Sequence, residues 1–342
     1  MSEPSRPPRI HDVARVAGVS VATVSRTMSN PAIVSEATRK AVEDAIAATG
    51  YTLNLTARNL RQQQVGGVLA LVPNIANPFF SQILAGISTV LRQRGLSLLV
   101  MDTTAVGDQP ALTVLGPYLN RSRSDGVIVL DGSLDAGLFT RLGCPPVVQA
   151  CEWIEGLDAP RVLADNIEGG RLAAQHLTDL GHRRILHVTG PAPNTLTASR
   201  RQGFVQGLAR AGLPDPGPND SIRGDFETKS GLDAVPHILA MDPRPTAIFC
   251  DNDEMAIGVI HGLSMAGIAV PQQISVMGFD NIEMSGYCLP PLTTVRQYRT
   301  RLGRRAAELL LARMQGDDDR QTVTLDVELM VRASTAPPPK HE

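Results

Sequence analysis

The chain reads Ile10-His-Asp-Val-Ala-Arg-Val-Ala-Gly-Val-Ser-Val-Ala-Thr-Val-Ser-Arg26 near its amino-terminal end, and this stretch decides the fold of that region. Its apolar residues recur at the i, i+3, i+4, i+7 spacing of one helical face, at Ile10, Val13, Ala14 and Ala17. Gly18 would end this helix, because glycine readily adopts the left-handed conformation of a C-terminal cap. Ser20 is a good N-cap for a second helix, with Val21, Val24 and Met28 on its inner face. Two short helices joined by a glycine-containing turn predict a helix-turn-helix, whose second helix enters the DNA major groove.

The helical pattern continues to residue 61. Ser35 can cap a third helix from Glu36 to Thr49, which Gly50 would end. The buried face of this third helix would be Ala41, Val42, Ala45 and Ile46. Asn54 can cap one further helix that runs to Arg61. So short a helix is marginal alone in water, and we therefore expect it to form only when it is docked on a partner.

The charge of the chain is unevenly distributed. Residues 1–63 hold eight Lys or Arg and five Asp or Glu, a net charge of +3, whereas the whole chain carries −2 and the remainder therefore −5. A basic amino-terminal part on an acidic body suits a module that touches phosphates and a body that does not.

Several function classes find no support in the sequence. Residues 1–9 are polar and proline-rich rather than a signal peptide, and no apolar run is long enough to span a membrane, so we expect a cytoplasmic protein. No phosphate-binding loop, nucleophile elbow or zinc spacing appears, so we expect neither an enzyme nor a cofactor. We expect structural roles rather than disulfide or metal-binding roles for the scattered cysteines and histidines: Cys144, Cys151, Cys250, Cys288, His176, His182, His187 and His237.

From residue 65 onward short apolar runs alternate with helical patterns. The predicted strands are 68–72, 96–101, 126–130, 146–149, 184–188, 247–250 and 274–278. The predicted helices are a segment from Pro78 through Leu91, then 112–120, 168–180, 200–211 and 253–265. Repeated strand–helix units imply an α/β fold, with parallel sheets covered by helices on both faces.

Ligands in such sheets bind beyond the carboxyl ends of the strands. Polar or aromatic residues follow the predicted strands at Asn74 to Phe80, Asp102, Asp131, Glu152-Trp153, Asp165-Asn166, Arg200, Asp225-Phe226, Asn252-Asp253 and Asp280-Asn281. We therefore expect a small-molecule site built from some of these residues.

Residues 9–61 resemble the DNA-binding headpiece of the LacI/GalR family of bacterial transcription regulators. The matching residues are Asp12-Val-Ala, Ala17-Gly-Val-Ser20, Thr23-Val-Ser-Arg26, Val34-Ser35, Gly50-Tyr51, Asn54, Ala57-Arg58 and Leu60. The body resembles the periplasmic-binding-protein-like core of the same family, with two Rossmann-like lobes joined by three crossovers. The signatures here are Asn77-Pro-Phe-Phe80, Asp165-Asn166, Gly181-His-Arg-Arg184, Arg200-x-x-Gly-Phe204, Asn252-Asp253-x-Met-Ala256 and Gly278-Phe-Asp280.

The resemblance implies a domain plan. Residues 1–8 would be disordered, 9–53 the helix-turn-helix domain, 54–64 a hinge helix and linker, 65–335 the effector-binding and dimerisation core, and 336–342 a disordered tail. Lobe one would hold 65–164 and 297–325, and lobe two 165–296 and 326–335.

The resemblance also implies which residues would contact DNA. In the headpiece they are Ser20, Val21, Ala22, Thr23, Ser25, Arg26 and Asn30, and in the hinge Asn54, Ala57, Arg58 and Leu60. Val21-Ala22 is similar to the galactose-repressor pair at the start of the recognition helix, where small apolar side chains can touch thymine methyl groups. The alternative role of Val21 is packing in the core of the domain instead of contacting DNA. Leu60 would wedge into a base step of the minor groove, a known way to kink DNA; the alternative is a plain flexible linker.

The implied effector contacts are Phe79, Phe80, Glu152, Trp153, Arg200, Phe226, Asn252 and Asp280. Arginine, carboxylate and amide groups suit sugar or nucleoside hydroxyls, and the aromatic rings could stack on a ring or base. The stretches Ala150 to Trp153, Arg223 to Phe226 and Gly278 to Ile282 look most like the nucleoside- and purine-responsive branch of the family, above all its cytidine-repressor members. A sugar is the alternative effector.

The sequence thus predicts a homodimeric repressor that binds a pseudo-palindromic operator in double-stranded DNA under the control of an effector. An activator of the same architecture is the alternative. A transport-type solute-binding protein would need an export signal and lack residues 9–61. An enzyme of the Rossmann class would need a glycine fingerprint after the first strand, where the chain has Val72-Pro-Asn-Ile-Ala.

Overall fold

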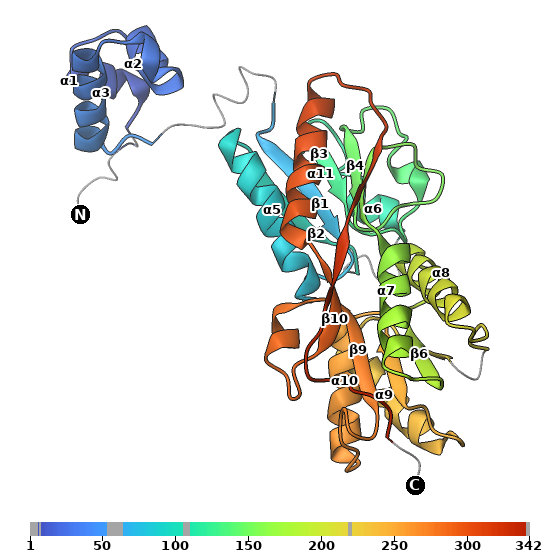
Figure 1. Ribbon diagram of the computed structural model, residues 1–342. Helices are drawn as coiled ribbons and strands as arrows, with labels where there is room; N and C mark the ends of the chain where they lie inside the picture. Colours follow the sequence, from blue (N-terminus) through green and yellow to red (C-terminus); the bar gives the residue numbers. More distant parts are fainter. Residues whose placement is uncertain (1–5, 7, 53–63, 105–109, 218–220, 340–342) are drawn as a thin grey trace, which may run out of the picture. The chain divides into compact units, whose positions relative to one another are not determined.

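The computed structural model describes residues 6, 8–52, 64–104, 110–217 and 221–339. The chain divides into two compact units, residues 1–63 and 64–342 (Figure 1). Each unit has a hydrophobic core of its own.

The first unit is a small helical domain. Its elements are α1 (Ile10–Ala17), α2 (Val21–Ser29), the 3-10 helix η1 (Pro31–Ile33) and α3 (Glu36–Thr49). Val13, Val24 and Val42 are fully buried between the three α-helices. Gly18 adopts the left-handed conformation, with φ 65°, and this ends α1. The predicted helix-turn-helix is confirmed, and α3 has the predicted bounds.

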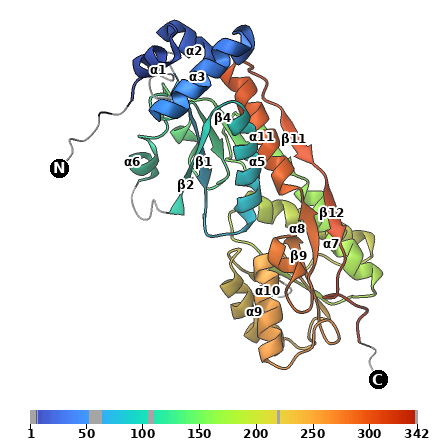
Figure 2. The same cartoon turned by 90° about the vertical axis from the view of Figure 1, so that its left-hand side faces the viewer.

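The second unit contains two six-stranded sheets, each forming the centre of one lobe (Figure 2). The sheet of lobe one has the order β11-β5-β4-β3-β1-β2 and the sheet of lobe two the order β12-β10-β9-β8-β6-β7. The strands are β1 (Gly67–Val72), β2 (Ser97–Asp102), β3 (Gly126–Val129), β4 (Val147–Ala150), β5 (Arg161–Ala164), β6 (Ile185–Thr189), β7 (Ser221–Arg223), β8 (Ala247–Cys250), β9 (Ser275–Asp280), β10 (Thr293–Gln297), β11 (Thr322–Leu325) and β12 (Val327–Met330). The strand pairs are parallel except for β10 with β12.

Helices cover both faces of each sheet. They are α5 (Phe79–Gln93), α6 (Ala111–Leu115), α7 (Asn166–Asp179), α8 (Thr195–Arg210), α9 (Thr228–Ala240), α10 (Asp253–Met265) and α11 (Arg299–Met314), with the 3-10 helices η3 (Ala136–Leu138) and η5 (Glu283–Gly286). In lobe one, α5 and α11 pack side by side on one face, and α6 and η3 lie on the other. In lobe two, α7 and α8 cover one face and α9 and α10 the other. Within the described part of the chain, none of the helices has the length and apolar content needed to cross a bilayer.

The chain passes between the lobes three times. The first passage joins β5 to α7 at residues 164–166, the second joins β10 to α11 at 297–299, and the third joins β11 to β12 at 325–327. The carboxyl ends of β5 and β10 therefore lie where the two lobes meet, and most of the predicted effector contacts cluster near this level.

Three expectations from the sequence need correction. Helix α6 ends at Leu115 rather than residue 120: Gly116 still has helical backbone, with φ −51° and ψ −41°, but Pro117 has no N–H group to continue the helical hydrogen bonds. Helix α8 begins at Thr195 rather than Arg200, because the Asn194 side chain accepts hydrogen bonds from the backbone of Leu196 and Thr197. The tail predicted as disordered from residue 336 begins with a fixed residue: Ala336 bonds Ser275 and His182.

Candidate functional site

The second helix of the first unit presents a small polar surface. Ser20 caps α2, and its Oγ accepts a hydrogen bond of 3.0 Å from the backbone N–H of Thr23. Val24 and Thr27 point into the domain and are buried, which turns Ala22 and Arg26 outward, where both are exposed. This arrangement places small and cationic side chains at the surface that a recognition helix presents to base edges and phosphates.

The other predicted DNA contacts of this unit divide into two groups. Thr23, Ser25 and Asn30 are at least partly exposed on or beside α2. Val21 is half-buried and packs against the core of the domain, so it contributes to packing whatever else it contacts. The four hinge predictions lie outside the described residues: Asn54, Ala57, Arg58 and Leu60.

A single carboxylate anchors the chain where it enters the second unit. The Oδ1 atom of Asp125 accepts the backbone N–H of Val65 at 2.7 Å, and its Oδ2 atom accepts those of Gly66 at 2.6 Å and Gly67 at 3.1 Å. Asp125 directly precedes β3, and Gly67 begins the neighbouring strand β1. The residues that follow the predicted hinge are thereby fixed to the centre of the lobe-one sheet.

A cavity of about 340 Å³ lies between the lobes at the carboxyl ends of the strands. The residues that line it are Pro73, Asn74, Asn77, Phe79, Phe80, Thr104, Asp131, Ser133, Cys151, Glu152, Pro191, Pro193, Asn194, Leu196, Arg200, Asp225, Phe226, Glu227, Asn252 and Asp280. Seven of the eight predicted effector contacts are among them. The exception is Trp153, which is half-buried outside the lining. Its preceding residues Cys151 and Glu152 both line the cavity, at a bend of the chain directly after β4.

Arg200 forms the cationic centre of this cavity. Its exposed fraction is 1%, and its Nε atom donates to Asn166 Oδ1 at 2.9 Å. One terminal nitrogen donates to the carbonyl of Asp251, and the other lies 3.4 Å from Oδ1 of Asp280. The guanidinium also lies 3.9 Å from the centre of the Phe279 ring. These contacts hold the planar guanidinium in one orientation, which suits it to fork onto hydroxyl groups of a ligand.

Close packing of two helices brings Arg200 to this position. A Cβ atom on Gly203 of α8 would lie 1.8 Å from the carbonyl oxygen of Ile167 in α7, and one on Gly170 of α7 would lie 2.1 Å from that of Arg200. The helices can approach this closely only because both positions lack a side chain. As a result Arg200 on α8 reaches Asn166 at the start of α7.

Asp280 and Asn252 form the lobe-two wall of the cavity. Asp280 Oδ1 accepts a hydrogen bond of 2.6 Å from Gln297. Burial raises the pKa of Asp280 to about 6, although the positive charges of Arg200 and Arg299 and the bond from Gln297 act to lower it. Asn252 is already engaged, since its oxygen caps α10 at Met255 and its nitrogen donates to the carbonyl of Phe226 at 2.8 Å. We therefore assign Asn252 mainly the task of shaping the wall.

The lobe-one wall is acidic and aromatic. Glu152 is buried, its Oε2 accepts the backbone N–H of Gly132 at 2.9 Å, and burial raises its pKa. Asp131 accepts hydrogen bonds from the side chains of Thr103 and Ser133. Phe79 and Phe80 are both 6% exposed, and their rings meet edge to face with centroids 5.1 Å apart. Most of each ring is thus core, with a small part turned to the cavity.

The backbone around the cavity is strained. Among the described residues the non-glycine positions with positive φ are Cys151 (69°), Phe226 (71°), Asp280 (112°) and Asn281 (55°). The first three line the cavity and the fourth follows Asp280. Such conformations cost about 1–3 kcal/mol each and cluster at ligand sites, where the surrounding structure holds them.

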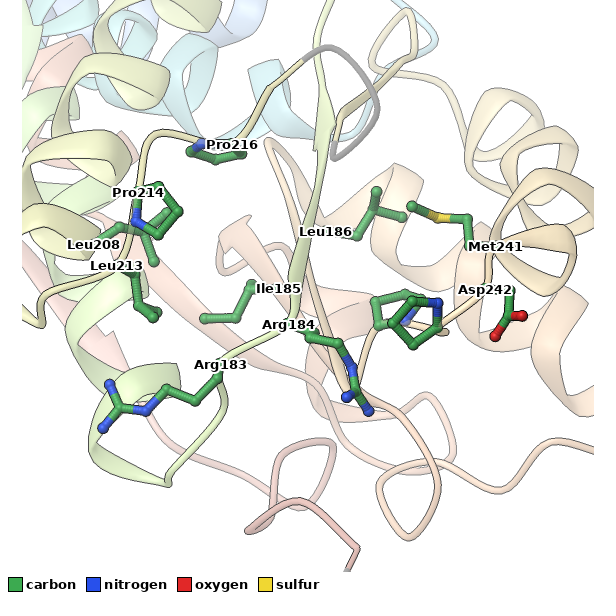
Figure 3. A pocket seen from close by; sticks show the side chains of 12 residues that line it. Arg183, Arg184, Ile185, Leu186, Leu208, Leu213, Pro214, Pro216, Met241 and Asp242 are labelled. Atoms are coloured by element: carbon green, nitrogen blue, oxygen red, sulfur yellow. The ribbon is translucent and has the colours of Figure 1, made fainter. Parts of the chain in front are cut away.

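A second cavity, of about 410 Å³, lies at the opposite end of the lobe-two sheet (Figure 3). Its labelled side chains come from the start of β6, from α8 and the loop after it, and from the loop before β8. Most are aliphatic or prolyl, including Ile185, Leu186, Leu208 and Pro214. It lies at the amino ends of the strands, whereas ligands of such sheets bind at the carboxyl ends, so we assign the effector site to the cavity between the lobes.

Several lining residues were not among the predicted contacts. Asn74, Asp131 and Asp225 follow strands directly, so the rule that pointed to the strand ends already included them. Asn194, Leu196 and Glu227 lie in or beside the first turns of helices whose starts the sequence pattern did not locate correctly. A correct reading of the Asn194 cap would have revealed the first two.

Comparison with known proteins agrees with this architecture. Residues 9–54 match the family described as bacterial regulatory proteins, lacI family, and residues 174–335 match a periplasmic binding protein-like domain. The chain is 38% identical over 327 residues to the HTH-type transcriptional repressor CytR of Escherichia coli (strain K12), which covers 95% of each chain. The chain belongs to the lacI family of bacterial regulatory proteins.

Two solved structures resemble nearly the whole chain. A lac repressor dimer bound to operator and the anti-inducer ONPF has a TM-score of 0.83 and 30% identity, covering 97% of this chain and 100% of that one. A complex of the transcriptional regulator CelR with cellobiose has a TM-score of 0.73 and 31% identity, covering 96% and 99%. The lacI family consists of DNA-binding regulators rather than enzymes, which confirms the regulator predicted from the sequence.

Proposed function

We propose that this protein is a transcriptional repressor that binds a pseudo-palindromic operator as a homodimer and is controlled by a nucleoside held between its two lobes. The observation that carries the proposal is the combination of a helix-turn-helix unit with a polar and aromatic cavity, in a chain that is similar over 95% of its length to a repressor. Because it acts on DNA in a bacterium, it belongs in the cytoplasm.

The lining of the cavity supports an uncharged effector. Among the described residues that line it are five carboxylate side chains, Asp131, Glu152, Asp225, Glu227 and Asp280, and a single guanidinium, that of Arg200. A phosphate group placed here would meet several like charges, which disfavours its binding. A nucleoside therefore fits better than the corresponding nucleotide: its ribose hydroxyls suit Arg200 and Asp280, and its base suits the edges of Phe79, Phe80 and Phe226.

A sugar is the second candidate for the effector. The structural neighbour CelR is a cellobiose complex, and hydroxyl groups would satisfy the same arginine and carboxylates. The aromatic side chains favour the nucleoside, because three phenylalanines border the cavity and a flat base offers both its faces to them.

The proposed dimer has support in lobe one. Strand β2 is the edge strand of its sheet, and it exposes Leu99 (44%) and Val100 (37%). Exposed apolar side chains on an edge strand invite pairing with another chain, and a second copy provides such a partner. The lac repressor, which is similar to this chain, has been solved as a dimer on its operator. Two headpieces would then each read one half of the operator, with Leu60 of each hinge as the minor-groove wedge.

A thermal-shift screen of the purified chain tests the effector class, because a ligand that binds only the folded state raises the melting temperature by mass action. Nucleosides, their monophosphates and free sugars are compared at equal concentration. The proposal predicts a shift with a nucleoside and a smaller one with its monophosphate. A shift with sugars alone would replace the nucleoside by the sugar and leave the DNA-binding role untouched.

A further inference from the structure

Arg299 is a buried cation that contacts both lobes. It is the first residue of α11, directly after the second passage between the lobes, and its exposed fraction is 3%. On the lobe-one side its Nη1 atom donates to the carbonyl of Phe79 at 3.1 Å and to that of Pro78 at 3.4 Å. On the lobe-two side its Nη2 atom donates to the carbonyl of Asn281 at 3.0 Å. One guanidinium thus bonds the first turn of α5 and the end of β9.

Each end of this link borders the cavity, although Arg299 itself is not part of the lining. Phe79 lines the cavity from lobe one, and Asp280, which precedes Asn281, lines it from lobe two. The Arg299 guanidinium also lies 5.7 Å from the centre of the Phe79 ring. A ligand that moves either wall must therefore move an acceptor of Arg299.

The corner formed by Asp280 and Asn281 needs to be held in place. Both residues have positive φ, at 112° and 55°, a conformation that side-chain-bearing residues rarely adopt. Asp280 is also bonded by Gln297 and Arg200, and Asn281 by Thr294 and Arg332. Among these residues, Arg299 is the one whose hydrogen bonds also reach lobe one.

A buried guanidinium strongly favours any arrangement that keeps its acceptors. Removing a charged group from water is costly unless it is hydrogen-bonded, and the Nε atom of Arg299 already lacks a partner in the described structure. Opening the angle between the lobes would lengthen the bonds on one side and leave more of the cation unsatisfied. The link therefore stabilises the arrangement of lobes seen here.

We propose that Arg299 is a positioning residue of the regulatory mechanism, which couples occupancy of the cavity to the relative orientation of the lobes. This inference rests on the proposed function, in which an effector acts on DNA binding through the lobes. Arg299 contributes no contact to the ligand; it transmits the position of the Asp280–Asn281 corner to the start of α5.

Arg332 provides a matched control, because it also bonds Asn281 but stays within lobe two. Its Nη2 donates to Asn281 Oδ1 at 2.6 Å, and its Nη1 donates to the carbonyl of Leu292 at 2.7 Å. Replacing either arginine by methionine keeps much of the side-chain volume and removes the positive charge. Arg299→Met breaks the link between the lobes, whereas Arg332→Met loosens the same corner without breaking that link.

The test measures operator affinity of the full-length chain with and without saturating cytidine, and the affinity for cytidine itself by calorimetry. We expect Arg299→Met to reduce the cytidine-induced change in operator affinity by about tenfold, the equivalent of losing one hydrogen bond to a charged group. The affinity for cytidine should stay within about threefold of the wild type, because Arg299 does not line the cavity. Arg332→Met should keep the full change. An unchanged response in Arg299→Met, or an equal loss in Arg332→Met, overturns the proposal.

Two further measurements keep the test decisive. If Arg299→Met fails to fold, Arg299→Lys replaces it, since one ammonium group cannot fork to both lobes; a wild-type response in this variant also overturns the proposal. If operator binding by the wild type does not respond to cytidine, the proposed effector is wrong. Amide hydrogen exchange without ligand then tests whether Arg299 links the lobes. The link predicts faster exchange at both 79–83 and 281–285 when Arg299 is altered, and only at 281–285 when Arg332 is altered; the same pattern in both variants contradicts it.

Discussion

Arg200 and Asp280 face each other across the floor of the cavity, with Nη2 of the arginine 3.4 Å from Oδ1 of the aspartate. Both side chains are almost fully buried, and each has further partners, Asn166 for the arginine and Gln297 for the aspartate. The pair is looser than an ideal charge-assisted hydrogen bond of about 2.7–2.9 Å. A hydroxyl group of a ligand can therefore bond both residues without first separating a tight ion pair.

Replacing Arg200 by alanine should abolish the effector response and leave operator binding intact. The change removes the one guanidinium among the described residues that line the cavity, while the helix-turn-helix lies in the other unit. Loss of a hydrogen bond to a charged group costs about 1.5–3 kcal/mol, so the affinity for the nucleoside should fall at least tenfold in calorimetry. Arg201→Ala is the control, because Arg201 pairs with Asp215 at 2.8 Å away from the cavity. Equal effects of the two variants would remove Arg200 from the site.

The stability of the protein should fall as the pH rises through the titration of Asp280. Its pKa is about 6 in the folded chain and 3.8 ordinarily, so the folded state holds this proton more tightly. Ionising Asp280 therefore lowers the free energy of unfolding. This loss is absent below about pH 4, grows between about pH 4 and 6, and reaches about 3 kcal/mol above pH 6.

Asp280→Asn isolates this effect, because asparagine does not titrate but still offers an oxygen to Gln297. The free energy of unfolding, measured in urea between pH 4.5 and 7, should fall in the wild type relative to the variant by about 2 kcal/mol. Parallel curves for the two proteins would show that Asp280 does not hold its proton in the folded state.

Gly203→Ala should destabilise lobe two and weaken effector binding together. The new Cβ would lie 1.8 Å from the carbonyl oxygen of Ile167, which forces α8 away from α7 and carries Arg200 with it. Overpacking of this kind costs about 1–3 kcal/mol, measurable by urea unfolding. The control is Gly217→Ala, where a Cβ would meet no atom within 4 Å. If Gly203→Ala were as stable as its control, the close contact of the two helices would not hold Arg200.

Asp125→Ala should weaken the transmission of the effector signal to DNA. Its carboxylate accepts three backbone N–H groups from residues 65–67, which follow the hinge. Without it these donors lose their fixed acceptor, so the effector-induced change in operator affinity should shrink about tenfold while the effector still binds. Asp135→Ala is a matched control, since Asp135 accepts one backbone N–H at Gly137, in the 3-10 helix η3 rather than at this junction. A full response in Asp125→Ala would mean that the junction is held by other contacts.

The sequence predicted the helix-turn-helix almost residue by residue, because its caps and apolar spacing are local signals. Ser20, Ser35 and Gly18 each occupy the predicted cap position. Strands with apolar runs such as 68–72 were equally readable, whereas the predictions missed β5, β7, β10, β11 and β12. Strand β10 is buried but reads Thr-Thr-Val-Arg-Gln, so it has no apolar run. Helix α9 was not predicted because Pro236 lies within it, and proline normally ends a helix.

The predicted effector contacts came from a topological rule and from the family resemblance, and seven of eight lie around one cavity. Residues that act across the lobes could not be found in this way. Arg299 opens an ordinary amphipathic helix in the sequence, and its partners Phe79 and Asn281 are about two hundred and about twenty residues away. Only the three passages between the lobes bring them together, and no local pattern records that geometry.

The most direct test of the central claim is the binding of the full-length protein to a pseudo-palindromic operator, obtained by selection from random DNA, measured by fluorescence anisotropy with and without cytidine. We expect the protein to bind this operator specifically, with an affinity that changes by about 5–150-fold when cytidine is added. In Arg200→Ala we expect the same operator binding but no response to cytidine. Specific binding that no nucleoside or sugar alters, or a response that survives in Arg200→Ala, would contradict it.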